Sequence, residues 1–410
     1  MNSTLVILSN RYPYPPGEEF LKAELDVLSK HFKRIFLIPT NRSIIYDQKT
    51  RKDVPDNVEV IHLFKGDKRS SLSRVIDIMK STKNMKWFWG ELSHSIRHGL
   101  KAPLIMLNRL ALACEIKNKL QKAIPDGYDY IFYSYWLTPS ALALAMLKED
   151  EKIDKAVSRV HGGDLYAERH NPAYIPFQGK VISVLDQTYS ISENGLNYLI
   201  NKHSDVEDKL SVQRLGTKSK VEYDQLNWDK QSAVLRLVSC SYLKPVKRIH
   251  LLADALKHCH FPVEWTHIGD GPERANIEKI VATLPEQIKV NLLGNKNNDE
   301  IMELYRSLDF DVFVNVSESE GIPVTIMEAF SFGIPVVATD VGGTSEVVNA
   351  DNGILLPKDL EPLDIAAQIT HFHNFSLEEK IKKGKAAYST WDHSYNAEKN
   401  YTKFATLLKD

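Results

Sequence analysis

The sequence has few of the features that place a chain outside the cell or across a membrane. It contains only three cysteines in 410 residues, Cys114, Cys240 and Cys259, and neither their number nor their spacing fits a disulfide framework or a metal site. We expect reduced, buried thiols. No apolar run reaches the 18 residues of a membrane span, and the apolar residues 5–8 are too few for a signal peptide. These absences predict a cytoplasmic protein.

A strong net charge and a phosphate-binding loop are also missing. The formal net charge is −1, and the sequence has no GxxxxGK[ST] pattern. The second absence argues against the chemistry of P-loop enzymes. With 410 residues and 43% hydrophobic residues, the chain has the composition of a globular protein that is longer than one ordinary domain. Two domains are therefore expected.

One stretch contains most of the information about function. Residues 310–316 form an apolar run typical of a buried strand, and residues 317–321 form a polar loop. A helix is expected from Pro323 to Gly333, because proline suits the first turn of a helix and glycine suits its C-terminal cap. Residues 335–339 form a second apolar strand. This order predicts a parallel βαβ unit, in which ligands bind at the carboxyl ends of the strands.

Two glutamates stand at that end of the predicted unit. Glu320 lies in the loop and Glu328 in the first turns of the helix, and Gly321 allows a ligand to approach the backbone closely. A carboxylate accepts two hydrogen bonds side by side, which matches the vicinal hydroxyls of a sugar or a ribose. Alternatively, Glu320 is a solvated loop charge and Glu328 a surface residue of the helix.

The stretch resembles the signature of glycosyltransferase family 4, roughly E-G-x-P-x-x-x-x-E-A-x-x-x-G-x-P-V-V-A-T-x-x-G-G-x-x-E. This resemblance implies a retaining glycosyltransferase with the α/β GT-B architecture: two Rossmann-like domains, a ligand cleft between them and a C-terminal helix that crosses back to the first domain. The run Arg159–Tyr166 resembles the bacterial surface-polysaccharide branch of the family. The matching residues are Glu320, Gly321, Pro323, Glu328, Ala329, Gly333, Pro335, Val336, Val337, Ala338, Thr339, Gly342, Gly343 and Glu346.

The resemblance also implies domain boundaries. Residues 1–215 are expected to form the acceptor-binding domain, completed by the crossing helix at residues 391–410. Residues 216–390 are expected to form the domain that binds the nucleotide-sugar donor. The βαβ pattern at the start of the chain, with apolar strands at residues 4–8 and 35–38, independently predicts a Rossmann-like first domain.

In the first domain, His161 directly follows an apolar strand and precedes two glycines, at the edge of the sheet where ligands bind. The alternative is a structural or solvated loop histidine. The resemblance implies that His161 faces the reacting sugar near its C6 side, and it suggests Asp164 and Arg169 as acceptor contacts. Gly17, in the loop after the first strand, is the residue implied to lie over the donor phosphates.

In the second domain, Lys247 stands at a strand-to-helix junction, where a lysine can reach a diphosphate. The family uses an arginine five residues earlier, but this chain has Tyr242 there, and Lys244 or Arg248 could compensate. The resemblance implies that Glu328 binds the ribose diol, that Glu320 binds the transferred sugar, and that Lys247 stabilises the leaving phosphate. The remaining residues implied in donor binding are Arg248, Gly269, Asn295, Gly321, Ile322, Pro323 and Val324.

Residues 65–122 are strongly basic. They contain thirteen Lys and Arg against four Asp and Glu, together with the aromatic run Trp87, Phe88 and Trp89. Basic residues mixed with tryptophan and leucine suit the surface of an anionic membrane. A set of helices with a solvated basic face explains the same pattern, whereas nucleic acid is disfavoured because no nucleic-acid-binding motif is present.

Taken with these observations, the resemblance implies an enzyme that transfers a sugar from a nucleotide diphosphate to a hydroxyl of a growing bacterial polysaccharide. Uridine diphosphate is the default carrier because it is the commonest one in the family. The donor is expected to be a UDP-hexose or UDP-N-acetylhexosamine, and the acceptor to be lipid-linked at the inner face of the cell membrane. No cofactor, metal ion or protein nucleophile is expected, consistent with the lack of a DxD motif in a metal-binding setting. The alternatives are a non-catalytic sugar-nucleotide-binding subunit and a sugar-nucleotide epimerase of the same fold.

Overall fold

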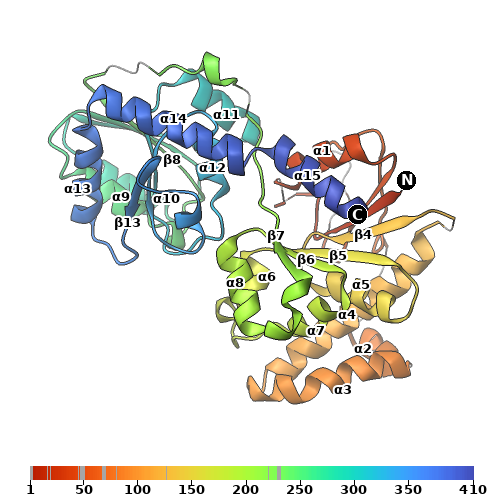
Figure 1. Cartoon of the computed structure of the whole chain (residues 1–410). Helices are drawn as coiled ribbons and strands as arrows, with labels where there is room; N and C mark the ends of the chain where they lie inside the picture. The colour runs from red at the N-terminus through yellow and green to blue at the C-terminus, as the bar shows by residue number, and fades with distance from the viewer. Residues whose placement is uncertain are drawn as a thin grey trace. The chain divides into compact units, whose positions relative to one another are not determined.

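The computed structural model divides the chain into two compact units (Figure 1). The first unit comprises Met1–Arg214 and Lys399–Asp410, and the second comprises Leu215–Glu398. The structure describes residues 3–15, 17–18, 20–44, 46, 51–66, 71–79, 81–125, 127–219, 221–228 and 232–410.

The first unit is built on a seven-stranded parallel sheet with the strand order β3-β2-β1-β4-β5-β6-β7. Every residue of β1 and β2 is buried, as expected for strands that are covered by helices on both faces. The strands are β1 (Thr4–Ser9), β2 (Ile35–Pro39), β3 (Val58–Val60), β4 (Tyr130–Ser134), β5 (Lys155–Val160), β6 (Gln187–Ser190) and β7 (Leu210–Val212).

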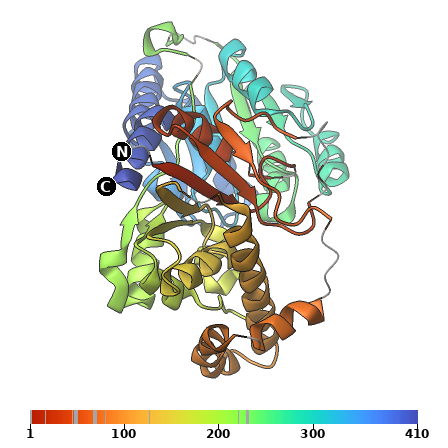
Figure 2. The same cartoon turned by 90° about the vertical axis from the view of Figure 1, so that its right-hand side faces the viewer.

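Three helices, α2, α3 and α4, lie between β3 and β4 and contain most of the basic segment. The two views agree that α2 and α3 lie at one end of the first unit, beyond α4 (Figures 1 and 2). No described helix of either unit is long and apolar enough to cross a membrane. The helices of this unit are α1 (Leu21–His31), α2 (Ser71–Met79), α3 (Thr82–Arg97), α4 (Ala102–Ala123), α5 (Pro139–Glu149), α6 (Gly162–Leu165), α7 (Gln178–Val184), α8 (Glu193–Lys202) and α15 (Ala397–Lys409).

The second unit contains a six-stranded parallel sheet with the order β10-β9-β8-β11-β12-β13. Its strands are β8 (Leu235–Cys240), β9 (Val263–Ile268), β10 (Ile288–Leu292), β11 (Val312–Asn315), β12 (Val336–Thr339) and β13 (Gly353–Leu356). Its helices are α9 (Ile249–Leu256), α10 (Arg274–Val281), α11 (Asn298–Ser307), α12 (Val324–Phe330), α13 (Pro362–His373) and α14 (Leu377–Ser394).

The two parallel sheets that the sequence predicts are therefore confirmed, with two differences in detail. Pro323 has an extended conformation (φ −74°, ψ 104°) and caps α12 instead of opening its first turn. Residues 391–398, expected to belong to the first domain, lie in the second unit. The reason is packing: Trp391 donates from Nε1 to Thr217 Oγ1 at 2.9 Å, and Tyr395 is buried in the core of that unit.

Each sheet has one point at which the strand order reverses. In the first unit it lies between β1 and β4, and in the second between β8 and β11. Loops that leave neighbouring strands in opposite directions open a crevice at such a point, where ligands of doubly wound sheets bind. The strand order alone thus directs attention to the loops after β1 and β4, and to those after β8 and β11.

Candidate functional site

In the second unit an ion pair joins the two loops at the reversal point. Lys247, at the end of the short turn that follows β8, places its Nζ 2.6 Å from Glu320 Oε1 in the loop after β11. Asn315 Nδ2, at the end of β11, donates to the same oxygen at 3.3 Å. Lys247 and Glu320, singled out in the sequence 73 residues apart, are therefore in direct contact.

Glu328 lies on α12 and is only 7% exposed, so the view that it is a surface residue of the helix is wrong. Its Oε1 accepts a hydrogen bond of 2.6 Å from Asn298 Nδ2 at the start of α11. Burial raises the pKa of Glu328 to about 7, although the hydrogen bond from Asn298 opposes the shift. A carboxylate with so few partners in a buried setting can accept hydrogen bonds strongly from a ligand.

The glycine turn after β12 packs directly on the loop that carries Glu320. Gly342 has φ +58°, and a Cβ there would lie 2.0 Å from the carbonyl oxygen of Glu320. The amide of Gly343 donates to the carbonyl of Gly321 at 2.7 Å. These contacts explain why the sequence has two glycines here, since any side chain at position 342 would displace the Glu320 loop.

Arg248 braces the exit of β11. Its guanidinium donates from Nε to Val316 O at 2.7 Å, from Nη2 to Ser317 O at 3.1 Å and from Nη1 to Lys358 O at 3.1 Å. Tyr242, where the family has arginine, is 63% exposed, and the Lys244 ammonium lies 5.6 Å from the centre of its ring. Arg248 is thus engaged with backbone carbonyls, while Lys244 lies at the surface beside Tyr242.

The other residues implied in donor binding lie at the carboxyl ends of strands or just after them. Gly269 has φ +137°, and a Cβ there would lie 1.9 Å from Ser241 O, so the loops after β8 and β9 touch at this point. Asn295 follows β10 and is exposed, Ile322 is buried, and Gly321, Pro323 and Val324 lead into α12. Their contacts with a ligand stay predictions.

In the first unit, Glu18 organises the loops after β1 and β4. Its carboxylate accepts from the backbone amides of Asn10 at 2.9 Å and Tyr12 at 2.7 Å, and also from that of Arg11. Trp136 Nε1, in the loop after β4, donates to Glu18 Oε1 at 2.6 Å. Glu18 is buried at φ +63°, next to the exposed Gly17 at φ +92°.

His161 follows β5 and is held beside this network. Its ring centre lies 4.4 Å from that of Trp136, and its Nε2 is 3.0 Å from Tyr135 O. A carbonyl can only accept, so Nε2 carries the proton and Nδ1 is the acceptor nitrogen. Burial and the nearby Arg159 charge lower the pKa of His161 to about 3. The ring is therefore neutral at physiological pH and can accept a hydrogen bond from a hydroxyl.

Asp164 holds the loop of His161 in place. Its buried carboxylate accepts from the His161 amide at 2.6 Å and from the Leu137 amide, and burial raises its pKa to about 7. Arg169 is exposed, with its guanidinium 4.8 Å from the centre of the Tyr166 ring. A direct contact of Asp164 or Arg169 with an acceptor stays a prediction.

The structure therefore gathers residues after β8 and β11 around Lys247, Glu320 and Glu328, and residues after β1, β4 and β5 around His161. Sequence reasoning missed Glu18 and Trp136. The available signal was a glutamate within a proline-rich loop directly after the first strand, but its partner lies 118 residues away. Among the described residues, no three His, Cys, Asp or Glu side chains are grouped so that they could hold a metal ion.

Part of the second unit matches a known protein family, and the chain is similar to several known glycosyltransferases. Residues 224–388 match the family model described as glycosyl transferases group 1. The chain is 27% identical over 254 residues to the UDP-N-acetylglucosamine–peptide N-acetylglucosaminyltransferase GtfA subunit of Streptococcus agalactiae; the match covers 56% of this chain and 48% of that subunit. It is 24% identical over 298 residues to a protein of Escherichia coli strain K12 provisionally named colanic acid biosynthesis glycosyltransferase WcaL, covering 70% of this chain and 72% of WcaL.

A solved structure resembles both units. The apo form of the lipopolysaccharide outer core galactosyltransferase WaaB superposes with a TM-score of 0.67 at 16% identity, over 99% of this chain and 100% of that one. The fold is GT-B. This confirms the predicted fold class. The chain spans only about half the length of the GtfA subunit that it matches.

Proposed function

We propose that the protein is a retaining glycosyltransferase of family 4 that transfers a sugar from a UDP-linked donor to a hydroxyl of a growing bacterial polysaccharide. The observation that carries this proposal is the contact of Lys247 with Glu320 at the reversal point of the second sheet, with the buried Glu328 on the helix that follows. All three lie within the residues that match the group 1 family model. The relatives named for UDP-N-acetylglucosamine transfer and for colanic acid biosynthesis support the donor and the pathway class.

In this proposal the donor's ribose diol binds the Glu328 carboxylate. The Lys247 ammonium moves from Glu320 to the diphosphate, where it neutralises charge that grows as the glycosidic bond breaks. Glu320 then accepts hydrogen bonds from hydroxyls of the transferred sugar. The backbone from Gly321 to Val324 borders the same site. No divalent metal is required, because Lys247 supplies the positive charge.

The first unit supplies the groups that orient the sugars. The neutral His161 accepts a hydroxyl hydrogen bond at Nδ1 near C6 of the transferred sugar, held there by Trp136 and the Tyr135 carbonyl. A ring that stays neutral down to about pH 3 suits hydrogen bonding to a hydroxyl and not proton transfer. The leaving phosphate itself helps to deprotonate the acceptor, so that no protein nucleophile is assigned.

A non-catalytic sugar-nucleotide-binding subunit is the second candidate. The observation that favours it is Tyr242 in place of the family arginine, because Arg248 is occupied by backbone carbonyls and only Lys244 is placed at the surface beside Tyr242. An epimerase would need further carboxylates or histidines around the sugar. Within the described part of the second unit, we identify only Glu320 and Glu328 for that purpose.

One screen tests the proposed function. The protein is incubated with UDP- and GDP-sugars, and release of free nucleotide is measured together with the thermal shift that each nucleotide produces. Release of UDP from one of the UDP-sugars, faster with a glycan acceptor, is the expected result. A thermal shift without any release would support the binding subunit, and neither effect with any nucleotide would contradict both candidates.

We also propose that the enzyme works at the inner face of the cell membrane on a lipid-linked acceptor. Part of the basic segment is neutralised within the fold, since Lys83 and Lys117 both pair with Asp150, at 3.0 and 2.6 Å. The aromatic run was expected to insert into lipid, and for Trp87 this prediction is wrong, because Trp87 is 5% exposed and packs against Phe177. Lys83, Lys117 and Trp87 therefore give no support to membrane docking.

What supports membrane docking is a smaller surface around the turn between α3 and α4, here called the α3–α4 turn surface. Four apolar side chains are more than half exposed there, and three exposed cations lie among them without an ion pair in the described part of the chain. Trp89 and Ile96 share one face of α3 because they are seven residues apart. The apolar members are Trp89, Ile96, Leu100 and Leu104, and the cations are Lys86, Arg97 and Lys101.

A further inference from the structure

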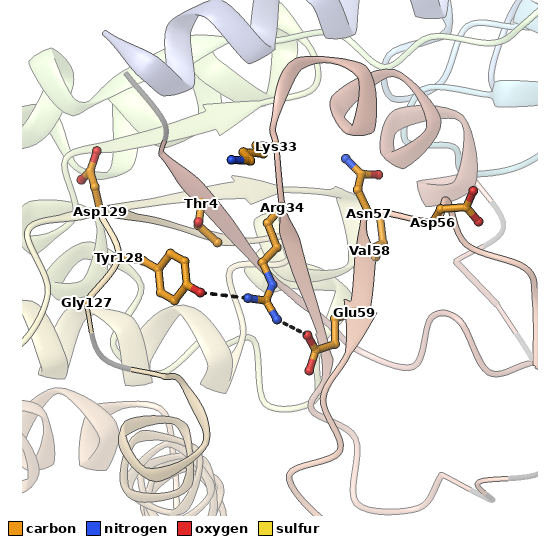
Figure 3. A pocket seen from close by; sticks show the side chains of 10 residues that line it. All are labelled: Thr4, Lys33, Arg34, Asp56, Asn57, Val58, Glu59, Gly127, Tyr128 and Asp129. Atoms are coloured by element: carbon orange, nitrogen blue, oxygen red, sulfur yellow. Dashed lines mark hydrogen bonds and ion pairs between the residues drawn. The ribbon is translucent and has the colours of Figure 1, made fainter.

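A hollow of about 900 Å³ lies at the amino ends of β1 to β4, the edge of the first sheet opposite the His161 loop (Figure 3). It is formed by the residues that immediately precede or begin four neighbouring strands, so the topology places it away from the candidate site. The lining residues are Thr4, Lys33, Arg34, Asp56, Asn57, Val58, Glu59, Gly127, Tyr128 and Asp129.

The central side chain of this hollow, Arg34, is fixed on both sides. Its Nη2 donates to Glu59 Oε2 at 2.6 Å and its Nη1 to the Tyr128 hydroxyl at 3.1 Å, as Figure 3 shows. The guanidinium also lies 4.7 Å from the centre of the Phe36 ring and 5.7 Å from that of Tyr128. A planar donor held in one orientation gives up little side-chain entropy when a ligand binds.

Two further polar groups are oriented by the fold. Asn57 Nδ2 donates to Ser29 O and to Phe32 O, both at 2.8 Å, which commits its two N–H donors and leaves its amide oxygen as an acceptor. Asp129 accepts a hydrogen bond of 2.7 Å from Ser3 Oγ. Donors and acceptors that are fixed in advance and line one hollow resemble the polar groups of a ligand site more than those of an ordinary solvated surface.

The chemistry of the lining selects the class of ligand. Tyr128 is 47% exposed and offers an aromatic surface beside the polar groups. The lining carries two cations, Lys33 and Arg34, and three carboxylates, those of Asp56, Glu59 and Asp129. The net charge of the hollow is therefore negative, which disfavours an anionic ligand. Fixed carboxylate, amide and guanidinium groups exchange paired hydrogen bonds with neighbouring hydroxyls, while an aromatic face covers apolar C–H groups.

We propose that this hollow is a second glycan-binding site, which holds a neutral oligosaccharide segment of the polymer at a distance from the reacting hydroxyl. The inference rests on the proposed function, because it assigns the polymeric acceptor as the ligand. Tyr128 stacks on one sugar ring. Arg34, Asn57 and Glu59 bind the hydroxyls of that ring and its neighbour. Such a site raises the local concentration of the growing chain near the enzyme without contacting the donor.

The test uses the full chain and four neutral hexasaccharides as probes: maltohexaose, cellohexaose, mannohexaose and N-acetylchitohexaose. Titration calorimetry is expected to show binding of at least one of them, and Tyr128→Ala is expected to weaken that binding about tenfold. Tyr223→Ala is the matched control, because Tyr223 is 45% exposed but lies in the second unit. A second pair of variants compares Arg34→Lys with Arg306→Lys. Arg306 is the matched control, because it is an exposed arginine that also pairs with a glutamate, Glu303.

The inference is overturned if no hexasaccharide binds the wild type, or if Tyr128→Ala and Tyr223→Ala bind as tightly as each other. The nucleotide-induced thermal shift is recorded for every variant, and it should not change, because no lining residue belongs to the second unit. A wild-type protein that binds no hexasaccharide but gives a normal UDP shift would therefore reject the second site alone. A missing UDP shift in the wild type would reject the proposed function instead.

Discussion

At the scale of single residues, Glu328, the proposed ribose-binding group, lowers the stability of the fold that carries it. The ordinary pKa of a glutamate is 4.5, and burial raises that of Glu328 to about 7. The unfolded chain loses this proton near pH 4.5, whereas the folded chain keeps it until about pH 7. Stability therefore falls as the pH rises through this window, by about 3 kcal/mol once both states are ionised.

The first prediction follows from that sign. Glu328→Gln should raise the melting temperature relative to the wild type, and the difference should grow from pH 5 to pH 8, because glutamine has no charge to bury but can still accept from Asn298. The same variant should weaken UDP binding by about 1.5–3 kcal/mol, as expected when a charged acceptor is lost. Calorimetry and thermal melts measure the two effects. Glu303→Gln, on the exposed face of α11, is the control, and unchanged UDP affinity in Glu328→Gln would remove the ribose-binding role.

The second prediction concerns Lys247. In the absence of ligand its ammonium is held by Glu320, and in the proposed reaction it meets a phosphate whose charge grows toward the transition state. Lys247→Ala should therefore lower kcat about 100-fold or more while changing the donor Kd much less. Lys257→Ala, which removes a half-buried lysine paired with Asp254, should leave both values unchanged. A loss of donor affinity with kcat intact would contradict the assigned role.

For single residues, the sequence could predict which side chains lie at the end of the sheet better than it could predict their burial and their hydrogen-bond partners. Lys247 and Glu320 stand at strand-to-helix junctions, and Glu328 stands on the helix after the second of these, all of which follow from local patterns. The structure places the three residues at the expected end of the second sheet. The burial of Glu328 and the hydrogen bond from Asn298 depend on how α11 packs against α12, which no local pattern encodes. Glu18 could not be assigned for the same reason, because its role depends on Trp136, which is 118 residues away and follows the neighbouring strand β4.

At the scale of elements, the final helix α15 packs on a buried ion pair between the first sheet and α1. Arg159 on β5 and Glu24 on α1 are fully buried, with Nη1 3.1 Å from Oε2, and the Arg159 guanidinium lies 4.6 Å from the centre of the Phe404 ring on α15. Tyr133 OH donates to the other Glu24 oxygen at 2.9 Å. The pair thus joins α1, two strands and the last helix of the chain.

The third prediction is that Arg159→Ala destabilises the protein by about 3–5 kcal/mol in urea unfolding, since it leaves the Glu24 carboxylate buried without its cation. The double variant Glu24→Leu with Arg159→Met should recover part of that loss, because two apolar side chains need no charged partners, while the Tyr133 hydroxyl loses its acceptor. Arg306→Ala, at an exposed ion pair on α11, should change stability by less than about 1 kcal/mol. A double variant as unstable as Arg159→Ala would show that the guanidinium acts through packing and not through charge.

Elements with strong local signals were predicted well, whereas the sequence did not show which faces of the helices in the basic segment are buried. The β-branched runs of β1, β2, β11 and β12 and the glycines that end their loops identify both sheets. The run Trp87-Phe88-Trp89 gave no indication of which ring faces the core. In α3 successive residues are turned by about 100°, so Trp87 packs on Phe177 while Trp89 is 62% exposed. Only the packing of α3 on its neighbours decides this.

At the scale of the whole molecule, metal independence is a testable consequence of the proposed use of Lys247. The fourth prediction is that donor hydrolysis or sugar transfer in the presence of excess EDTA stays within about threefold of the untreated rate, because no divalent cation is needed at the diphosphate. The measurement compares rates before chelation, after chelation and after magnesium is added back. Abolition by EDTA and recovery with magnesium would reject the metal-independent mechanism.

The last prediction concerns the α3–α4 turn surface and the place where the molecule works. Each exposed cation near an anionic membrane contributes roughly 1 kcal/mol, and the exposed apolar side chains add insertion at the interface. The protein should therefore sediment with vesicles that contain phosphatidylglycerol, and should leave them as salt rises.

Charge reversal at Lys86, Arg97 and Lys101, or Trp89→Ser with Leu104→Ser, should abolish sedimentation and spare donor hydrolysis in solution. Two other lysines of the basic segment, Lys80 and Lys83, are left unchanged in this test, because Lys80 lies outside the described residues and Lys83 pairs with Asp150. Reversal of Lys289, Lys385 and Lys403, all distant from this surface in the sequence, is the charge-matched control. Wild-type protein that ignores anionic vesicles at low salt would show that the surface is merely solvated, and a soluble acceptor would then replace the lipid-linked one.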